Sequence, residues 1–286
     1  MTEKALFQEA LPHGAVRCLL CPRGCVIPEG KTGFCRVRLN KGGVLQALTA
    51  HTITAAAYDP TEKKPFARFY PGRLIFSIGN FGCNFCCDYC QNHAIVYDPA
   101  TVQGISSDEA ILDAASAHDS AGIAFTYNEP TIAYELVLRL SRKAKEKGLA
   151  IAVISNGFIN EAPLKELLPY TDAWNIDLKM GRDDRYRAIC GGTMEDVLRS
   201  IRLIYEGGKH IEVTCLLIPS LNTDDDSLTA MAKSIAAISP DIPVHLSRYF
   251  PAFRRTTPPT PLSAMARGEA IFRKYIHEVH LGNMPA

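Results

Sequence analysis

Long apolar runs and an excess of either charge are both missing from this chain of 286 residues. No stretch approaches the roughly 18 apolar residues that a membrane-spanning helix needs, and the first ten residues carry charges early, unlike a signal peptide. The 31 basic and 30 acidic residues leave a formal charge of +1, which gives no support to binding of nucleic acid or of a membrane surface. We therefore expect a cytoplasmic protein with no nucleic-acid partner and no membrane partner.

The low hydrophobicity that marks disordered chains is also absent. Hydrophobic residues make up 47% of the sequence, so we expect a globular fold. The length is sufficient for one large domain with a smaller appendage.

Cysteine, by contrast, is plentiful, with ten residues in the chain. In a reducing compartment, cysteines in this number point to metal binding rather than to disulfides. Seven of the ten fall into two tight groups with the spacing of metal ligands. We call the first the N-terminal cysteine group (Cys18, Cys21, Cys25 and Cys35) and the second the cysteine triplet (Cys83, Cys87 and Cys90).

The cysteine triplet follows a short apolar run that is typical of a strand, and its members are separated by three and two residues. Three thiolates so close together can converge on one metal centre. They leave a four-coordinate site, or a four-iron cluster, one ligand short. Structural zinc sites usually have four protein ligands, whereas an incomplete shell leaves room for substrate chemistry.

The N-terminal cysteine group has four members within 18 residues, separated by two, three and nine residues. The glycines between them allow tight turns that bring backbone N–H groups toward thiolate sulfurs. Zinc held by four thiolates and an auxiliary iron–sulfur cluster fit this pattern about equally well. The sequence therefore predicts a second metal site without choosing between the two.

From residue 74 onward, short apolar runs alternate with amphipathic stretches. This alternation indicates βαβ units, right-handed crossovers and a parallel sheet. Six units are too few for an eight-stranded barrel, but they fit a partial (β/α)6 barrel or a doubly wound open sheet. The expected strands are 74–79, 123–127, 150–155, 173–178, 211–218 and 244–247, and the expected helices are 107–120, 132–147, 161–168, 195–206, 225–238 and 262–277.

Residues 1–73 have a different character. They contain the N-terminal cysteine group, a Gly-rich turn at 41–43 and a β-like stretch at 44–57. We predict that they form a small Cys-rich, metal-binding subdomain packed onto a barrel domain of residues 74–286. A Pro- and Thr-rich linker at 256–261 leads to the final helix of that domain.

The cysteine triplet, with Tyr89 directly before its last member, resembles the signature of the radical S-adenosylmethionine enzymes. The N-terminal Cys-Leu-Leu-Cys-Pro-Arg-Gly-Cys, the Tyr-Asn-Glu-Pro motif and the closing Gly-Asn pair look like the AmmeMemoRadiSam family of that superfamily. So do the stretches at 62–72 and 244–251. This family is related to the activating enzymes of glycyl radical enzymes, such as pyruvate formate-lyase-activating enzymes.

The resemblance implies an α/β fold, the partial (β/α)6 TIM-like barrel, and a [4Fe-4S] cluster on the cysteine triplet. S-adenosylmethionine would chelate the fourth iron through its amino and carboxylate groups. One electron from a low-potential donor such as flavodoxin or ferredoxin would then cleave it to methionine and a 5′-deoxyadenosyl radical. That radical abstracts a hydrogen atom from substrate, and we assign no residue as an acid or base.

The resemblance also implies where S-adenosylmethionine is held, because such barrels place ligands at the C-terminal ends of their strands. The Tyr-Asn-Glu-Pro motif stands where these enzymes carry a Gly-Gly-Glu-Pro-like element, although it also fits an ordinary helix start. In the Asp-Leu-Lys element, Asp177 and Lys179 are two residues apart, so the alternation of a strand places both on one face. The expected cofactor contacts are Tyr89, Asn128, Glu129, Ser155, Asn156, Asp177, Lys179 and His245.

The sequence leaves the substrate open. The first hypothesis is a glycyl-radical-type activase whose substrate is the backbone of another protein. The second is a radical enzyme that acts on a small molecule or on a modified side chain. The third, of a different class, is a metal-binding scaffold without turnover. Relatedness to activases favours the first, but fold-level kinship is weak support for a substrate.

Overall fold

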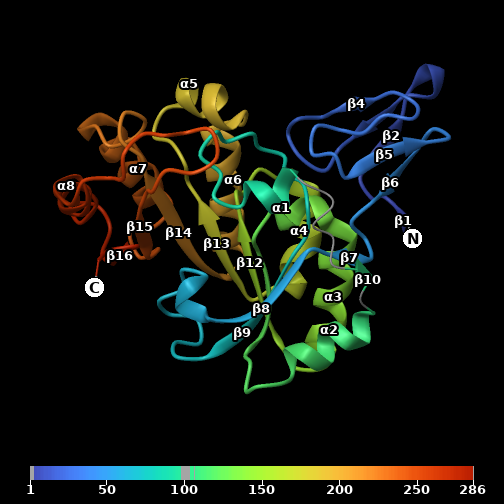
Figure 1. Ribbon diagram of the computed structural model, residues 1–286, viewed down its shortest axis with the longest axis horizontal. Helices are drawn as coiled ribbons and strands as arrows, with labels where there is room; N and C mark the ends of the chain where they lie inside the picture. The colour runs from blue at the N-terminus through green and yellow to red at the C-terminus, as the bar shows by residue number, and fades with distance from the viewer. Residues whose placement is uncertain (1–2, 98–103, 106, 286) are drawn as a thin grey trace.

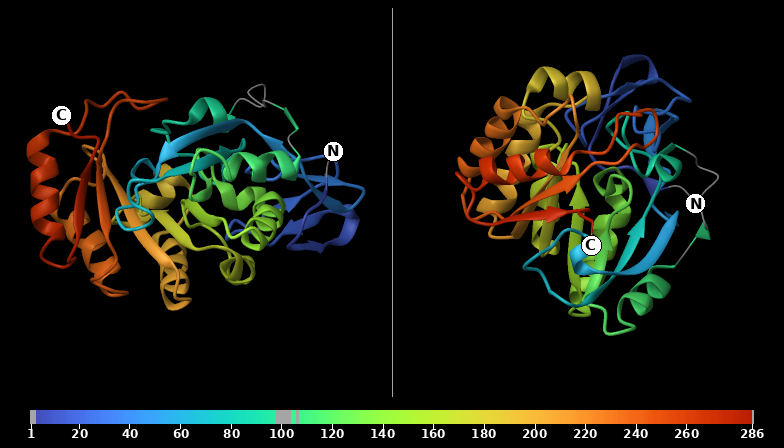
Figure 2. Two further views of the ribbon diagram at one scale, coloured as in Figure 1. Left: turned by 90° about the horizontal axis from the view of Figure 1, so that it is seen from below. Right: turned by 60° about the vertical axis from the view of Figure 1, so that its left-hand side comes forward.

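The computed structural model describes residues 3–97, 104–105 and 107–285. One curved sheet forms the centre of the molecule, helices cover its outer face, and a small β-rich lobe lies at the end that carries the N-terminus (Figures 1 and 2). The sheet has eight strands in the order β16-β15-β14-β13-β12-β11-β9-β8, and every neighbouring pair from β9 to β16 is parallel. Because the edge strands β8 and β16 do not pair with each other, the barrel stays open. The prediction of a partial α/β barrel is confirmed.

All six predicted strands belong to this sheet, and their observed limits differ from the expected ones by at most two residues. The sheet gains one strand at each edge that the alternation did not reveal: β8 pairs antiparallel with β9, and β16 pairs parallel with β15. The strands are β8 (Ala55–Pro60), β9 (Leu74–Gly79), β11 (Gly122–Phe125), β12 (Ala150–Ser155), β13 (Ala173–Asp177), β14 (His210–Leu217), β15 (Val244–Arg248) and β16 (Val279–Gly282).

Helices occupy the connections, as the parallel order requires. Apolar faces of the longer ones pack on the sheet, as in α3, where Leu136, Val137 and Leu140 are buried. The helix expected at 262–277 ends at Phe272, because the chain then turns into β16. The helices are α1 (His93–Tyr97), α2 (Asp108–Ala115), α3 (Tyr134–Glu146), α4 (Glu161–Leu167), α5 (Asp183–Arg185), α6 (Met194–Glu206), α7 (Asp225–Ala236) and α8 (Leu262–Phe272), with a π-helical turn at Tyr186–Cys190.

The N-terminal lobe contains two small antiparallel sheets, β1-β6-β5 and β2-β3-β4. Gly42 and Gly43 both have positive φ and form the expected turn between β5 and β6. A subdomain of residues 1–73 remains a prediction, and the pairing of β8 with β9 ties its last part to the large sheet. The strands of this region are β1 (Glu3–Lys4), β2 (Gln8–Ala10), β3 (Val16–Cys18), β4 (Val26–Ile27), β5 (Arg38–Lys41), β6 (Val44–Ala47) and β7 (Thr52–Ile53), which pairs with β10 (Gly104–Ile105).

The segment between β8 and β9 closes the N-terminal end of the barrel. Phe66 and Phe69 are buried against a layer of small residues, Ala124, Ala150, Ala152 and Ala173, that leaves room for the two rings. The backbone N–H groups of residues 67 and 68 donate to the Glu212 carboxylate at 2.8–3.0 Å. With this end filled, the free end of the barrel is the one where the parallel strands finish.

None of the helices in the described ranges combines the length and the apolar content needed to cross a bilayer.

Candidate functional site

The loop that carries the cysteine triplet leaves β9 and is fixed by one amide side chain from the next strand end. Asn128 accepts the N–H of Asn80 at 2.9 Å and donates to the carbonyl oxygens of Phe81 and Gly82 at 3.1 and 3.2 Å. An asparagine is well suited to this position because it can accept and donate at once. Asn128 therefore sets the path of the chain into the triplet.

The cysteine triplet lies on the wall of a cavity of about 270 Å³ at the C-terminal ends of the strands. Seven of the eight residues expected from the sequence to contact a cofactor also line it. Among the lining residues that the structure describes, no other cysteine and no histidine supplies a fourth ligand to the triplet. The seven are Tyr89, Asn128, Glu129, Ser155, Asn156, Asp177 and Lys179.

Glu129 is the buried centre of the polar contacts on one side of the cavity. Its Oε1 accepts from the backbone N–H and the hydroxyl of Thr131 and from the Ser155 hydroxyl, at 2.7–3.0 Å. Its Oε2 accepts from the backbone N–H of Asn156 at 2.7 Å. Burial raises the pKa of Glu129, although these four donors partly offset the effect. Glu129 both begins a helical turn, as the alternative interpretation held, and joins the ends of β11 and β12.

Asp177 and Lys179 face each other across the strand end, with 2.9 Å between Oδ2 and Nζ. They share one face as their spacing predicts. Burial by itself would lower the pKa of Lys179, but Asp177 and the neighbouring thiols outweigh burial and raise it. The pair therefore offers the cavity one fixed negative and one fixed positive charge.

The three thiols of the triplet differ in their surroundings. Burial raises the pKa of Cys83 and of Cys90, whereas a hydrogen bond with Cys190 lowers the pKa of Cys87. The Tyr89 hydroxyl lies 3.4 Å from the Cys190 sulfur. Sequence reasoning gave Cys190 no role, and no sequence signal links it to the triplet, because it comes from a π-helical turn a hundred residues away.

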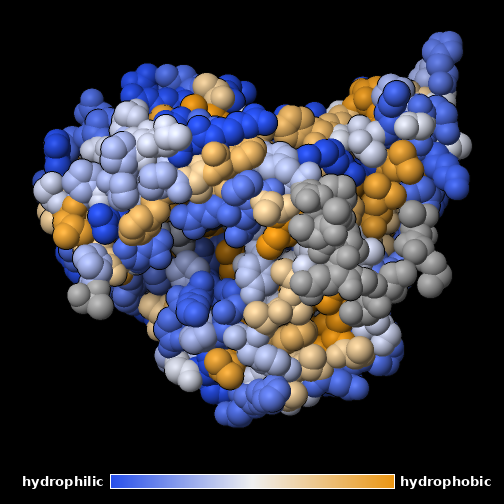
Figure 3. All heavy atoms as spheres, in the orientation of Figure 1, coloured by the Kyte–Doolittle hydropathy of each residue, from blue (hydrophilic) through white to orange (hydrophobic). Residues whose placement is uncertain are grey.

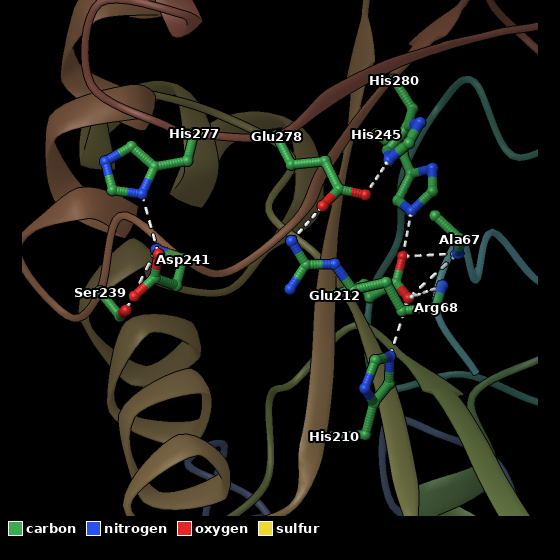
Figure 4. A network of polar contacts seen from close by, with 10 residues as sticks. All are labelled: Ala67, Arg68, His210, Glu212, Ser239, Asp241, His245, His277, Glu278 and His280. Carbon is green, nitrogen blue, oxygen red and sulfur yellow. Dashed lines mark hydrogen bonds and ion pairs between the residues drawn. The ribbon is translucent and has the colours of Figure 1, made fainter.

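His245 is not among the residues that line the cavity, and its contact with a cofactor stays a prediction. Its Nε2 lies 2.5 Å from Oε2 of Glu212, and its ring stacks on His280 (Figure 4). It shares the inner face of β15 with Ser247, which does line the cavity. His245 therefore lies on the same strand and face as Ser247, two residues nearer the closed end of the barrel.

Other lining residues were missed or left without a role. Strand alternation carried to the last residue of each strand would have found Thr126 and Ser247. The same alternation places Leu216 on the face of Thr214, whereas Tyr97 gave no such signal. The further lining residues are Phe85, Gln91, Asn92, Val96, Tyr97, Thr126, Tyr127, Ile154, Thr214, Leu216, Ser247 and Asn283.

The N-terminal cysteine group lines a second, much smaller cavity. Burial raises the pKa of Cys18, Cys21 and Cys35, and the backbone N–H two residues further along, of Leu20, Arg23 and Val37 in turn, lowers each pKa in part. In the triplet, the Cys83 sulfur accepts the N–H of Phe85, likewise two residues further along, at 3.3 Å. Backbone donors of this kind are the usual outer support of metal-bound thiolates.

In the ranges that the structure describes, no three His, Cys, Asp or Glu side chains are grouped tightly enough to hold a single metal ion. Both cysteine sets surround a cavity instead of converging on one point. A four-iron cluster is wider than one ion, so the cavity of about 270 Å³ beside the cysteine triplet suits it.

Comparison with known proteins gives the chain a family. Residues 78–232, more than half of the chain, match the radical SAM superfamily. An uncharacterized protein of Methanocaldococcus jannaschii is 38% identical over 99% of this chain and 85% of its own length. The pyruvate formate-lyase-activating enzyme of Streptococcus mutans is 26% identical over 59% of this chain and 68% of its own length.

Solved structures resemble the fold. A radical SAM methyltransferase from Sphaerobacter thermophilus matches with a TM-score of 0.56 and 18% identity, over 74% of this chain and 67% of that one. A domain of a pyruvate-formate lyase-activating enzyme from Bacteroides vulgatus matches with a TM-score of 0.51 and 18% identity, over 57% of this chain and 100% of that one. At these identities the likeness concerns the fold alone.

Proposed function

The chain belongs to the radical SAM superfamily, and from that premise we propose that it cleaves S-adenosylmethionine at a [4Fe-4S] cluster held by the cysteine triplet. Membership implies radical chemistry with both cofactors. The observation that carries the proposal for this chain is the cavity at the open end of the barrel. There three thiols, without a fourth cysteine or histidine among the described lining residues, face the polar ends of the neighbouring strands.

The residues present fit this pair of cofactors. Three thiolates bind three irons and leave one free for a ligand that is not protein, as an incomplete shell does. When bound and reduced by an external one-electron donor, the cluster would supply the chemistry that splits S-adenosylmethionine into methionine and a 5′-deoxyadenosyl radical, which would take a hydrogen atom from substrate. The protein has to exclude water and hold one target C–H bond in place.

We assign the polar lining residues to the methionyl and ribose parts of S-adenosylmethionine. That molecule carries an ammonium and a carboxylate, and the cavity offers a paired carboxylate and ammonium in Asp177 and Lys179, 2.9 Å apart. Lys179 suits the carboxylate, and Asp177 suits the ammonium or a ribose hydroxyl. The amide nitrogen of Asn156 lies 3.7 Å from the Cys83 sulfur, and we assign it as a hydrogen-bond donor to the sulfurs of the cluster.

The substrate class that we propose is the backbone of another protein, as for a glycyl-radical-enzyme activase. Support comes from relatives that are named pyruvate formate-lyase-activating enzymes, such as the Streptococcus mutans protein. A low-potential electron carrier, flavodoxin or ferredoxin, would be the second partner.

Anaerobic reconstitution followed by dithionite reduction with S-adenosylmethionine tests the reaction. Wild-type protein is expected to release 5′-deoxyadenosine. A variant with all three triplet cysteines replaced by alanine is expected to lose about four iron atoms, as a [4Fe-4S] cluster requires, and to form none. Absence of 5′-deoxyadenosine from the wild type would leave only a metal-binding scaffold.

The substrate needs a separate experiment. A glycyl-radical signal in a candidate partner protein, recorded by electron spin resonance after incubation with the activated enzyme, would support the activase. Cleavage without such a signal in any glycyl radical enzyme of the source organism would favour a small molecule or a modified side chain.

A further inference from the structure

A buried arginine without enough hydrogen-bond partners faces the N-terminal cysteine group. Arg38 is 1% exposed and lines the small cavity between the four thiols. Its Nη1 donates to Glu135 at 2.9 Å and to the carbonyl oxygen of Leu6 at 3.2 Å. In the described part of the chain, its Nε and Nη2 have no partner. Buried cationic donors are costly to leave unpaired, so the cavity lacks an acceptor that the protein is built to hold.

The four thiols and the guanidinium of Arg38 line one cavity, which is open to about 10 Å³. The sulfurs of an iron–sulfur cluster are hydrogen-bond acceptors, so a cluster at the four cysteines would give Nε and Nη2 of Arg38 the partners that they lack.

The two cysteine sets are in contact through a short polar chain. Asn84 lines the N-terminal cavity, and its Oδ1 accepts from the Asn156 amide at 2.8 Å. The same amide lies 3.7 Å from the Cys83 sulfur. The guanidinium of Arg23, another lining residue, donates to the Asn84 carbonyl oxygen at 2.8 Å. One pair of amides therefore separates the two cavities, which is a path suited to electron transfer.

The outer side of the N-terminal cysteine group is apolar and basic. Leu19, Val26 and Phe34, each next to one of its cysteines, are 39%, 53% and 43% exposed. Hydrophobic residues reach the surface of this lobe among hydrophilic ones (Figure 3). Of the exposed residues in 15–41, four are basic and one is acidic, although the whole chain is nearly neutral. Such a surface matches an acidic protein partner.

We propose that the N-terminal cysteine group holds an iron–sulfur cluster that receives electrons from an acidic, low-potential carrier protein. A reduced flavin or iron–sulfur carrier gives up one electron at this surface, and the N-terminal cluster takes it up and hands it to the centre at the cysteine triplet. No bond and no proton changes place in this transfer. The relay rests on the proposed function of the triplet, but the identity of the N-terminal metal does not.

Metal analysis of the variant that lacks the triplet cysteines tests the cluster. After anaerobic reconstitution of the full chain, this variant is expected to retain iron and sulfide in equal amounts and to contain no zinc. Electron spin resonance after reduction should show a cluster signal. Zinc in place of iron, or no bound metal, would overturn the proposal. This result does not depend on S-adenosylmethionine cleavage, so it stands even if the proposed function fails.

Rates of reduction test the relay. The triplet centre is followed by freeze-quenched electron spin resonance with dithionite and, separately, with reduced flavodoxin. In a Cys21→Ala, Cys25→Ala variant, the ratio of the flavodoxin rate to the dithionite rate is expected to fall at least tenfold. An unchanged ratio would refute the relay.

Surface variants keep this test valid if the cysteine variant does not fold. Val26→Glu with Phe34→Glu places negative charge on the basic surface and is expected to lower the flavodoxin rate at least tenfold, with a weaker effect at high salt. Leu262→Glu is the matched control, because Leu262 is 47% exposed on α8 at the opposite end of the molecule (Figure 1). An equal loss in both proteins would contradict docking at the N-terminal lobe.

Discussion

Gly82, the residue before the first cysteine of the triplet, packs directly on the backbone of Cys35. A Cβ built on Gly82 would collide with the carbonyl oxygen of Cys35 and stand 2.8 Å from a Val37 methyl group. Gly82 also has a φ of +80°, a conformation that favours glycine. The last cysteine of the N-terminal group and the first of the triplet are therefore held at a fixed separation.

Gly82→Ala is expected to destabilise the protein well beyond the cost of positive φ. The matched control is Gly30→Ala, because Gly30 has a φ of +72° and free space around its Cβ position. The control should cost about 1–2 kcal/mol, and Gly82→Ala about 1–3 kcal/mol more, since backbone has to move. Chemical denaturation of the metal-free proteins measures both. Equal losses would show that the contact with Cys35 relaxes freely.

Asn128→Asp is expected to disturb the loop that carries the triplet while preserving side-chain shape. The carboxylate can still accept from Asn80, but it faces the carbonyl oxygens of Phe81 and Gly82 to which the amide donates. Two lost hydrogen bonds and the repulsion should cost about 2–4 kcal/mol. Iron bound by the triplet should fall in step, as measured after reconstitution. Full iron content with native stability would remove Asn128 from this role.

The sequence predicted the parts of the structure that follow a repeating pattern or that gather residues of one type. The six strands followed from their apolar runs, and both cysteine sets from their spacing. Six polar residues at or just beyond strand ends lie in one cavity because parallel strands all finish at the same end of the barrel. His245 shows the limit of this reasoning, since alternation gives the face of a residue but not its depth along the barrel.

Contacts between segments distant in the chain could not be predicted. Arg38 gives no signal of its own, because an arginine is usually at the surface. Its burial follows from the packing of the N-terminal lobe on α3, which brings Glu135 within 2.9 Å. The strand β8 was missed for a related reason, since it joins the large sheet from the N-terminal part of the chain as an antiparallel edge.

The pair of Arg38 and Glu135 should be strongly coupled. Both side chains are nearly inaccessible, at 1% and 2%, so Arg38→Met leaves a buried carboxylate without its partner. The expected loss is about 3–5 kcal/mol. The double variant with Glu135→Gln should lose about 1–3 kcal/mol less than the sum of the losses in the two single variants, because the two residues are in contact. A double-mutant cycle by denaturant unfolding measures this coupling, and additive losses would contradict it.

The closed end of the barrel should make stability depend on pH through Glu212. Burial by itself would raise the pKa of this carboxyl, but hydrogen bonds from His210, His245 and two backbone N–H groups outweigh it and lower the pKa to about 2 (Figure 4). A carboxyl whose pKa is lower in the folded state stabilises the protein above its unfolded pKa. The contribution, about 3 kcal/mol for a shift of this size, is lost as the pH falls from about 5 to about 2.

Glu212→Gln is the variant that isolates this effect. Its free energy of unfolding should lie about 3 kcal/mol below that of the wild type at pH 7, and the difference should shrink steadily below pH 5. Glu206→Gln, at an exposed position on α6, is the control and should stay within about 0.5 kcal/mol of the wild type. Urea unfolding at pH 7, 4 and 3 gives the three values for each protein. A difference that stays constant over this range would mean that the Glu212 network stabilises the barrel through its shape and not through the charge of the carboxylate.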